Sequence, residues 1–149
     1  MARIDDEVRI KFANERHRFV VNLVYTSGWI RNISAEDLKP FGISSQQFNI
    51  LRILRGAGDW MPMNDVKDIM IEKAPNATRL ADKMLAKDLI KRKRSDSDRR
   101  VVYVRISNEG LFLLSKIDDK RSEIQVALSE RITEDEAKLV SQILDKFRG

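Results

Sequence analysis

Positively charged side chains are concentrated in one stretch of this sequence, residues 87–105. Eight lysines or arginines against three aspartates give this stretch a net charge of +5, which equals the formal net charge of all 149 residues. A surface that binds phosphate groups concentrates charge in this way, because each neutralised phosphate releases condensed counterions. A basic segment that serves only solubility is the alternative. The charged residues of the stretch are Lys87, Asp88, Lys91, Arg92, Lys93, Arg94, Asp96, Asp98, Arg99, Arg100 and Arg105.

Residues suited to catalysis or metal binding are scarce. The sequence contains no cysteine and a single histidine, His17, and it has no glycine-rich loop that could cradle a phosphate. Disulfides, thiolate metal sites and redox-active thiols are therefore excluded, and a metal site needs more than one histidine ligand. We expect no catalytic residue, no metal and no cofactor, and we expect His17 to be an ordinary helical residue. An enzyme is the least favoured class of function.

A helix is predicted over residues 75–87, where the basic stretch begins. Its apolar residues recur at helical spacing, and Pro75 suits the first turn because its missing N–H needs no partner there. The opposite face is polar and mostly basic. The apolar residues are Ala77, Leu80, Ala81, Met84 and Leu85, and the polar ones are Asn76, Thr78, Arg79, Asp82, Lys83 and Lys87.

A two-stranded ribbon with a charged tip is predicted over residues 90–106. The basic run Lys91–Arg94 leads into the turn-rich Ser95–Asp98, and apolar and polar residues then alternate up to the end of the stretch. Such alternation among β-branched residues is typical of a strand. A third, short extended segment is expected at Asp59–Met63, because Pro62 cannot donate to a strand ladder and disfavours helix at the residue before it.

Two helices are predicted before the basic helix. A capping-box pattern, Ser44 with Gln47, opens the first, which ends near residues 56–58. Asn64 is expected to cap the second, a short helix over residues 65–71, and a turn joins it to the basic helix. Two short helices joined by a turn, the second basic on its outer face, are typical of a helix-turn-helix.

Amphipathic helices are also predicted at both ends of the sequence. The first covers about residues 6–30 and is followed by a connector, Asn32–Gly42, which contains proline and glycine. A second helix runs from Ser107 over more than twenty residues, and the capping box Thr133–Glu136 opens a last one. Their apolar faces have no partner in the middle of the chain. We expect a second subunit to bury them; packing within the chain is the alternative.

Several segments resemble the MarR (multiple antibiotic resistance regulator) family of bacterial winged-helix repressors. Residues 98–110, DRRVVYVRISNEG, are similar to the family's wing, which has an Asp-x-Arg tip, an alternating strand and Leu-Thr-x-x-Gly. Gly42–Leu51 resembles the family's Gly-Leu-Thr-x-x-Gln-Phe-x-x-Leu. Thr78–Leu80 and Leu85–Ile90 are similar to its recognition helix and the following turn. Together the matches span Phe41–Gly110 in the family's order and spacing.

Two positions depart from the family's pattern. Asp88 stands where the family usually has glycine, so an aspartate must adopt the left-handed conformation that ends the helix, at a greater cost. Ser107 replaces the usual threonine and can cap a helix equally well.

The resemblance implies a mainly α fold with a small β-wing, a winged helix-turn-helix flanked by N- and C-terminal dimerisation helices. The DNA-binding domain would cover residues 34–110, and the dimerisation helices residues 1–33 and 111–149. In the family the terminal helices of two chains interlace into a triangular dimer, so a homodimer is expected. A two-fold dimer predicts a pseudo-palindromic operator with half-sites about one turn, roughly 34 Å, apart.

Double-stranded DNA is the expected partner. The helix over residues 75–87 should lie in the major groove, where each base pair presents a distinct pattern of donors and acceptors. The wing tip should reach an adjacent minor groove, whose narrow, negative floor suits a guanidinium group. By resemblance Asp98 holds Arg100 in place while Arg99 or Arg100 enters the groove. The candidate DNA-binding residues are Asn76, Thr78, Arg79 and Lys83 in the helix, and Arg94, Asp98, Arg99 and Arg100 in the wing.

A sequence-specific transcriptional regulator is the favoured function. The resemblance implies a repressor whose dimer responds to a small, often aromatic, effector. Tyr25 and Trp29 could line a pocket for such a molecule, although core or interface positions are the more common role of these residues. A non-specific or architectural DNA-binding protein is the alternative, and it would bind operator and random DNA with similar affinity at fixed salt.

The sequence has no sign of export or membrane insertion. The first residues, Met1–Glu7, lack the apolar core of a signal peptide, and nowhere do 18 apolar residues run together. We therefore expect a soluble cytoplasmic protein without a membrane partner.

Overall fold

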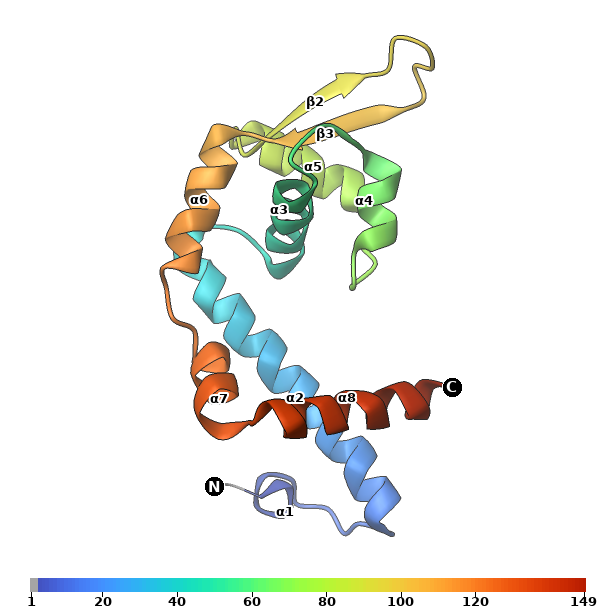
Figure 1. The fold of residues 1–149 in the computed structure, drawn as a ribbon, viewed down its shortest axis with the longest axis vertical. Helices are drawn as coiled ribbons and strands as arrows, with labels where there is room; N and C mark the ends of the chain where they lie inside the picture. Colours follow the sequence, from blue (N-terminus) through green and yellow to red (C-terminus); the bar gives the residue numbers. More distant parts are fainter. Residues whose placement is uncertain (1–2) are drawn as a thin grey trace. The chain divides into compact units, whose positions relative to one another are not determined.

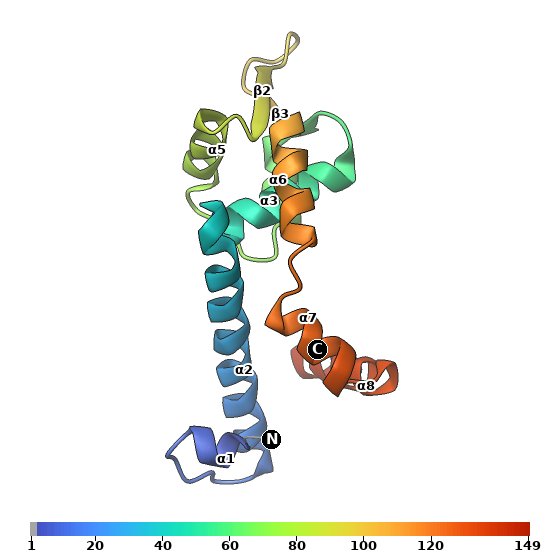
Figure 2. The ribbon, with the colours of Figure 1, turned by 90° about the vertical axis from the view of Figure 1, so that its left-hand side faces the viewer.

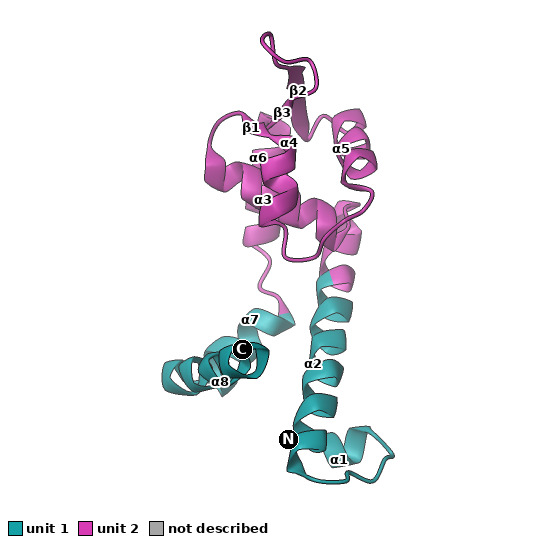
Figure 3. Cartoon of the chain, turned by 90° about the vertical axis from the view of Figure 1, so that its right-hand side faces the viewer, with its two compact units in different colours: residues 1–34, 123–149 teal, residues 35–122 magenta. Residues whose placement is uncertain are grey.

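The computed structural model describes residues 3–149; Met1 and Ala2, at the start of the expected N-terminal segment, lie outside the described residues. The chain divides into two compact units (Figure 3). One unit is made of residues 1–34 with 123–149, and the other of residues 35–122. The second unit contains the expected helix-turn-helix and the sheet.

The second unit packs its helices against a small antiparallel sheet (Figure 1). The strand order is β1-β3-β2, and the register pairs Ile90 with Ile106 and Arg94 with Val102. The β2–β3 ribbon extends beyond the helices of its unit in both Figure 1 and Figure 2. The ribbon and the third strand at its edge are confirmed, as is the mainly α fold with a small β-wing. The elements are η1 (Lys39–Phe41), α3 (Ser45–Ala57), β1 (Met61–Pro62), α4 (Met63–Ile69), α5 (Ala77–Ala86), β2 (Ile90–Arg94), β3 (Val102–Ile106) and α6 (Asn108–Asp118).

Helix α3 supplies the centre of the core of this unit. Its residues Ile50, Leu51 and Leu54 are fully buried, in one apolar cluster with Met84 of α5 and Leu114 of α6. Fully burying a side chain of this size contributes about 1.5–3 kcal/mol. The cluster therefore fixes α5 and α6 against the same central helix.

The predicted ends of α3 are confirmed. The Ser44 hydroxyl accepts from the Gln47 N–H at 3.1 Å, and the Gln47 side chain accepts from the Ser44 N–H at 2.9 Å. Gly58 ends the helix in a left-handed conformation, with φ at +70°. Gly56, in contrast, lies inside the last turn.

A tight junction joins the end of α5, the start of β2 and the start of α6. Asp88 adopts the predicted left-handed conformation, with φ at 56°, and the next N–H, that of Leu89, donates to the Met84 carbonyl. Ser107 caps α6 as predicted: its hydroxyl accepts from the Gly110 N–H at 3.0 Å and donates to the Asp88 carbonyl at 2.5 Å. A Cβ at Gly110 would lie 2.3 Å from the Leu89 carbonyl oxygen. Glycine is thus required for this close approach.

The prediction of one helix over residues 6–30 is wrong. The structure has α1 (Ile4–Glu7) and, after a break, α2 (Glu15–Leu38). The Asn14 side chain accepts from the His17 N–H at 3.0 Å, and such an asparagine cap starts a new helix instead of continuing the previous one.

The predicted connector Asn32–Gly42 is mostly helical. α2 continues to Leu38, because Pro40 occupies the first turn of the 3₁₀ helix η1, where its missing N–H breaks no hydrogen bond. Gly42 ends this turn with φ at 68°.

Four further helix boundaries differ from prediction, among them the end of α4, which lies at Ile69 and not at residue 71. α4 begins at Met63 with Pro62 in the capping position, so Asn64 lies in the first turn and is not the cap. α5 begins at Ala77, two residues after Pro75, and ends one residue before Lys87.

The long helix predicted from Ser107 is broken into α6, which ends at Asp118, and α7 (Glu123–Arg131). In the break, Lys120 forms an ion pair with Asp37 at 3.2 Å, which connects this segment to the end of α2.

The unit made of the chain ends contains α1, most of α2, α7 and α8 (Glu134–Arg148). The capping box Thr133–Glu136 at the start of α8 is confirmed. Phe19 and Phe147 meet edge to face at 5.7 Å, yet α7 and α8 have no buried residue. The large apolar side chains that remain exposed on the helices of this unit are Val20, Val24, Tyr25, Ile30, Leu128, Leu139, Val140, Ile143 and Phe147.

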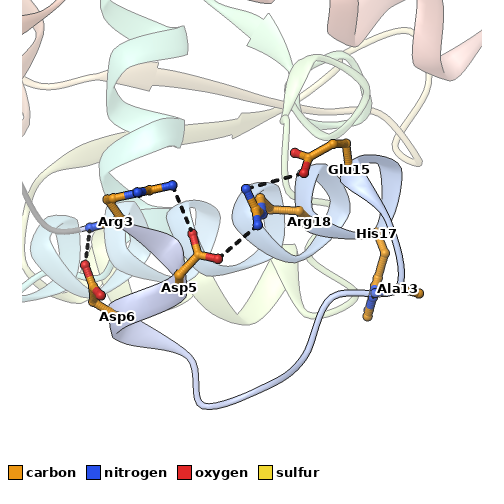
Figure 4. Close-up of polar contacts among 7 residues, drawn as sticks. All are labelled: Arg3, Asp5, Asp6, Ala13, Glu15, His17 and Arg18. Carbon is orange, nitrogen blue, oxygen red and sulfur yellow. Dashed lines mark hydrogen bonds and ion pairs between the residues drawn. The ribbon is translucent and has the colours of Figure 1, made fainter.

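A chain of ion pairs fixes the start of this unit (Figure 4). Arg18 pairs with Asp5 of α1 at 3.1 Å and with Glu15 of its own helix at 3.4 Å. His17 accepts the Ala13 N–H at Nδ1 at 3.2 Å, so its role here is local. Among residues 3–149, none of the helices has the length and apolar character needed to cross a bilayer.

We expect Gly110→Ala to lower the free energy of unfolding by roughly 1–3 kcal/mol, because the added methyl group would overlap the backbone carbonyl of Leu89. The matched control is Gly56→Ala, where no atom lies within 4 Å of the new Cβ. This change in a helix interior should raise the free energy of unfolding by about 0.5–1 kcal/mol. Urea unfolding measures both, and a loss at Gly110 no larger than the change at Gly56 would contradict the close approach.

Candidate nucleic-acid interface

Helix α5 presents one polar face to solvent. Ala77, Leu80, Ala81 and Met84 are buried in the core, so helical periodicity turns the intervening side chains outward. The candidate residues Thr78, Arg79 and Lys83 are all exposed on this face, together with Asp82, and Asn76 is exposed at the N-cap. The helix is ten residues long, about 15 Å, which suits insertion into a major groove.

The wing tip is built around two short side chains. The Ser95 hydroxyl accepts from the Asp98 N–H at 3.3 Å, and Asp98 accepts from the Arg100 N–H at 3.0 Å. The expected contact between Asp98 and Arg100 is thus present, but it goes to the main chain of Arg100. Arg94 donates to the Arg99 carbonyl at 3.4 Å. The tip backbone is therefore ordered by local hydrogen bonds, while the four candidate wing residues are exposed.

A hollow of about 220 Å³ lies where β1 and α4, α5 and the wing meet. It brings together two of the candidates, Thr78 of α5 and Arg100 of the wing. The candidates Asn76, Arg79, Lys83, Arg94, Asp98 and Arg99 are not among its lining residues. The residues that line the hollow are Pro62, Met63, Asn64, Lys67, Thr78, Ala81, Arg92, Arg100, Val101, Val102 and Val104.

Lys67 and Arg92 also line the hollow, although neither is among the residues predicted to bind DNA. A signal for Arg92 was available: it lies two residues after the buried Ile90, so strand alternation places both on one face of β2. No pattern in the sequence marks Lys67, because its position at the hollow depends on how the turn between α4 and α5 places α4.

Several cations of the basic stretch are engaged in contacts within the unit. Lys87 donates to the Gly42 carbonyl, which connects the end of α5 to the end of η1. Lys93 lies 4.4 Å from the centroid of the Trp60 ring, in a cation–π contact. Arg92 pairs with Asp82 of α5 at 2.6 Å.

The site offers binding groups but no catalytic arrangement. Among residues 3–149 no cluster of three or more histidine, cysteine, aspartate or glutamate side chains could hold a metal ion. Exposed guanidinium and ammonium groups on a helix and an adjacent ribbon can instead contact phosphates and base edges.

Comparison with known proteins places the chain in a family. The MarR family model matches residues 43–102. The chain is 30% identical over 106 residues to the HTH-type transcriptional regulator MhqR of Bacillus subtilis, an alignment that covers 70% of this chain and 72% of MhqR. This chain belongs to the MarR family. It is also 31% identical over 122 residues to the transcriptional regulator MgrA of Staphylococcus aureus, covering 78% of this chain and 77% of MgrA.

A solved structure extends the likeness to the fold. A mutant of MarR from E. coli, crystallised in complex with operator DNA, matches this MarR-family chain with a TM-score of 0.71 at 21% identity. The match covers 85% of this chain and 91% of that one. The winged-helix fold class is confirmed. The relatives are transcriptional regulators and not enzymes, as the sequence predicts.

We expect Arg100→Ala to weaken binding to cognate and random duplexes alike, and to reduce the slope of log affinity against log salt by about 1. The physical reason is that a wing residue at a phosphate-lined groove contributes charge to any sequence. Fluorescence anisotropy at several salt concentrations measures both effects. Lys138→Ala on α8 removes the same charge away from the wing and serves as the control; unchanged binding by Arg100→Ala to both duplexes would show that the wing assignment is wrong.

Proposed function

We propose that this MarR-family protein is a sequence-specific DNA-binding transcriptional regulator that binds a pseudo-palindromic operator as a homodimer. The observation that carries the proposal is that Thr78 of α5 and Arg100 of the wing line the same hollow. A helix that reads the major groove and a ribbon that reaches the next minor groove need this adjacency. The E. coli MarR structure with operator DNA supports it through its similar fold.

In this proposal Asn76, Thr78, Arg79 and Lys83 contact base edges or phosphates in the major groove. Arginine and asparagine have the matching geometry for bidentate contacts, with guanine and adenine respectively. The wing residues Arg94, Asp98, Arg99 and Arg100 serve the minor groove.

The proposed dimer is supported by the apolar faces of the terminal helices. α8 has no buried residue, although Leu139, Val140, Ile143 and Phe147 lie on one side of it. Contiguous exposed apolar surface of this kind is rare on monomeric proteins. We therefore assign residues 1–33 and 111–149 to dimerisation and residues 34–110 to DNA binding. Helix α6 crosses the boundary at residue 110 and packs in the second unit, so it belongs to both parts.

We further propose that a small aromatic effector alters the dimer and releases the operator, which makes the protein a repressor. A cavity of about 790 Å³ within the unit of the chain ends supports an effector, because Tyr25 and Trp29 line it. The Tyr25 hydroxyl donates to Glu7 at 2.8 Å, and this bond raises the pKa of Tyr25 above its usual value. A protein that acts on chromosomal DNA in this way would work in the cytoplasm.

Selection of bound fragments from a random DNA pool tests the function. We expect a motif with two-fold symmetry and half-sites about 10 base pairs apart, because each subunit of a two-fold dimer inserts one α5. A non-specific or architectural protein would yield no motif and would bind selected and random duplexes equally at fixed salt.

We expect Ile143→Glu to shift the protein from dimer to monomer, because the new carboxylate would be buried in the apolar face of α8 on association. Light scattering over a dilution series measures the change in mass. Ser141→Glu adds the same charge on another side of α8 and should leave the dimer intact. A wild-type protein that is monomeric in dilute solution would contradict the dimer.

A further inference from the structure

The two faces of strand β2 have different surroundings. Ile90 is buried, so strand alternation places Arg92 on the same face as Ile90, toward α5. Lys93 lies on the opposite face, where its ammonium group stacks on Trp60. Arg92 reaches across to α5, and its Nη1 donates to Asp82 Oδ1 at 2.6 Å. This ion pair connects the proposed recognition helix to a strand of the wing.

Asp82 is the only acidic residue of α5, and it lies on the exposed face of the helix. A carboxylate on a surface that approaches phosphates weakens binding through repulsion of like charges. The exposed face of α5 otherwise carries Thr78, Arg79 and Lys83, all of which suit contact with DNA. Asp82 is therefore expected to have another role, whose benefit outweighs this repulsion.

The contact with Arg92 supplies that role. Arg92 lines the same hollow as Thr78 of α5 and Arg100 of the wing. An arginine side chain that is free on the surface can contact DNA phosphates whatever the base sequence. The hydrogen bond from Arg92 Nη1 to Asp82 Oδ1 instead keeps the guanidinium group beside α5 and limits the phosphates that it can reach.

We propose that Asp82 is a specificity-determining positioning residue. It holds Arg92, ties the wing strand to the recognition helix and keeps Arg92 from contacting phosphates indiscriminately. This inference rests on the proposed function, because it assumes that α5 and the wing read DNA.

The pair has little effect on folding. The Asp82 and Arg92 side chains are 53% and 42% exposed, and ion pairs with this exposure contribute little to stability. Asp82→Asn should therefore change the melting temperature by less than about 3 °C. Its effect should appear in DNA binding, which separates a positioning role from a structural one.

The test compares full-length wild type, Asp82→Asn, Arg92→Gln and the double variant. The probes are the duplex selected from a random pool by the wild type and a scrambled duplex of the same composition. For Asp82→Asn we expect affinity for the scrambled duplex to rise about threefold, with a salt slope steeper by about 1, because Arg92 is released to contact phosphate. The ratio of selected to scrambled affinity should fall about tenfold. In the double variant, the salt slope should no longer be steeper than that of the wild type.

Two controls separate this effect from a general change in charge. Asp96→Asn removes a carboxylate from the wing tip and should leave the affinity ratio within about twofold of wild type. Lys93→Gln removes a cation from the opposite face of β2 and, combined with Asp82→Asn, should leave the steeper slope in place.

Each other result overturns the inference. An unchanged ratio in Asp82→Asn, or an equal fall in Asp96→Asn, removes the special role of the pair. A double variant that behaves like Asp82→Asn, with a selected motif altered at one base pair, shows that Asp82 reads a cytosine directly. If the wild type itself does not discriminate between the duplexes, the proposed function fails first; if it discriminates and Asp82→Asn does so equally, only the inference fails.

Discussion

The arrangement of the DNA-facing elements depends on one close contact between backbones. The first turn of α6 lies close against the Leu89 carbonyl, and this approach is possible because Gly110 has no side chain. The same carbonyl accepts the Ser107 N–H at 3.1 Å. Leu89 directly precedes β2, and Ser107 directly follows β3. The base of the wing and the end of α5 are therefore fixed by main-chain groups, which move less than long side chains. Asp88 completes the turn in a conformation that few residues other than glycine adopt.

The basic stretch divides into cations that support the fold and cations that face solvent. Lys87, Lys93 and Arg92 each contact a partner within the unit, while Arg99 and Arg100 lie at the exposed tip. A net charge of +5 therefore overstates the charge that is free to contact phosphates. The positive charge that remains free lies at the wing tip and on the exposed face of α5, so the positive potential is directed to that side of the unit.

Local signals in the sequence were enough for much of this fold. Capping boxes at Ser44 and Thr133, and the alternation that ends at Ile106, are interactions between near neighbours and need no tertiary information. Boundaries set by distant partners were not predictable. The break after α6 contains Lys120, and its partner, Asp37, is so far away in the sequence that the local pattern around Lys120 does not reveal the contact.

The same distinction applies to the candidate site. The exposure of Thr78, Arg79 and Lys83 follows from the apolar stripe on the other side of α5, so helical periodicity alone predicts it. The contact of Asp82 with Arg92 depends on how β2 lies across the helix. The register of β2 against β3, which pairs Arg92 with Val104, likewise comes only from the structure.

The stacking of Lys93 on Trp60 has a practical consequence. The chain contains two tryptophans, Trp29 and Trp60, and they lie in different compact units. An indole beneath an ammonium group is sensitive to any displacement of that group. Replacing Trp29 with phenylalanine would therefore leave a single intrinsic fluorophore at the base of the ribbon, and its emission would follow wing movement without an attached dye.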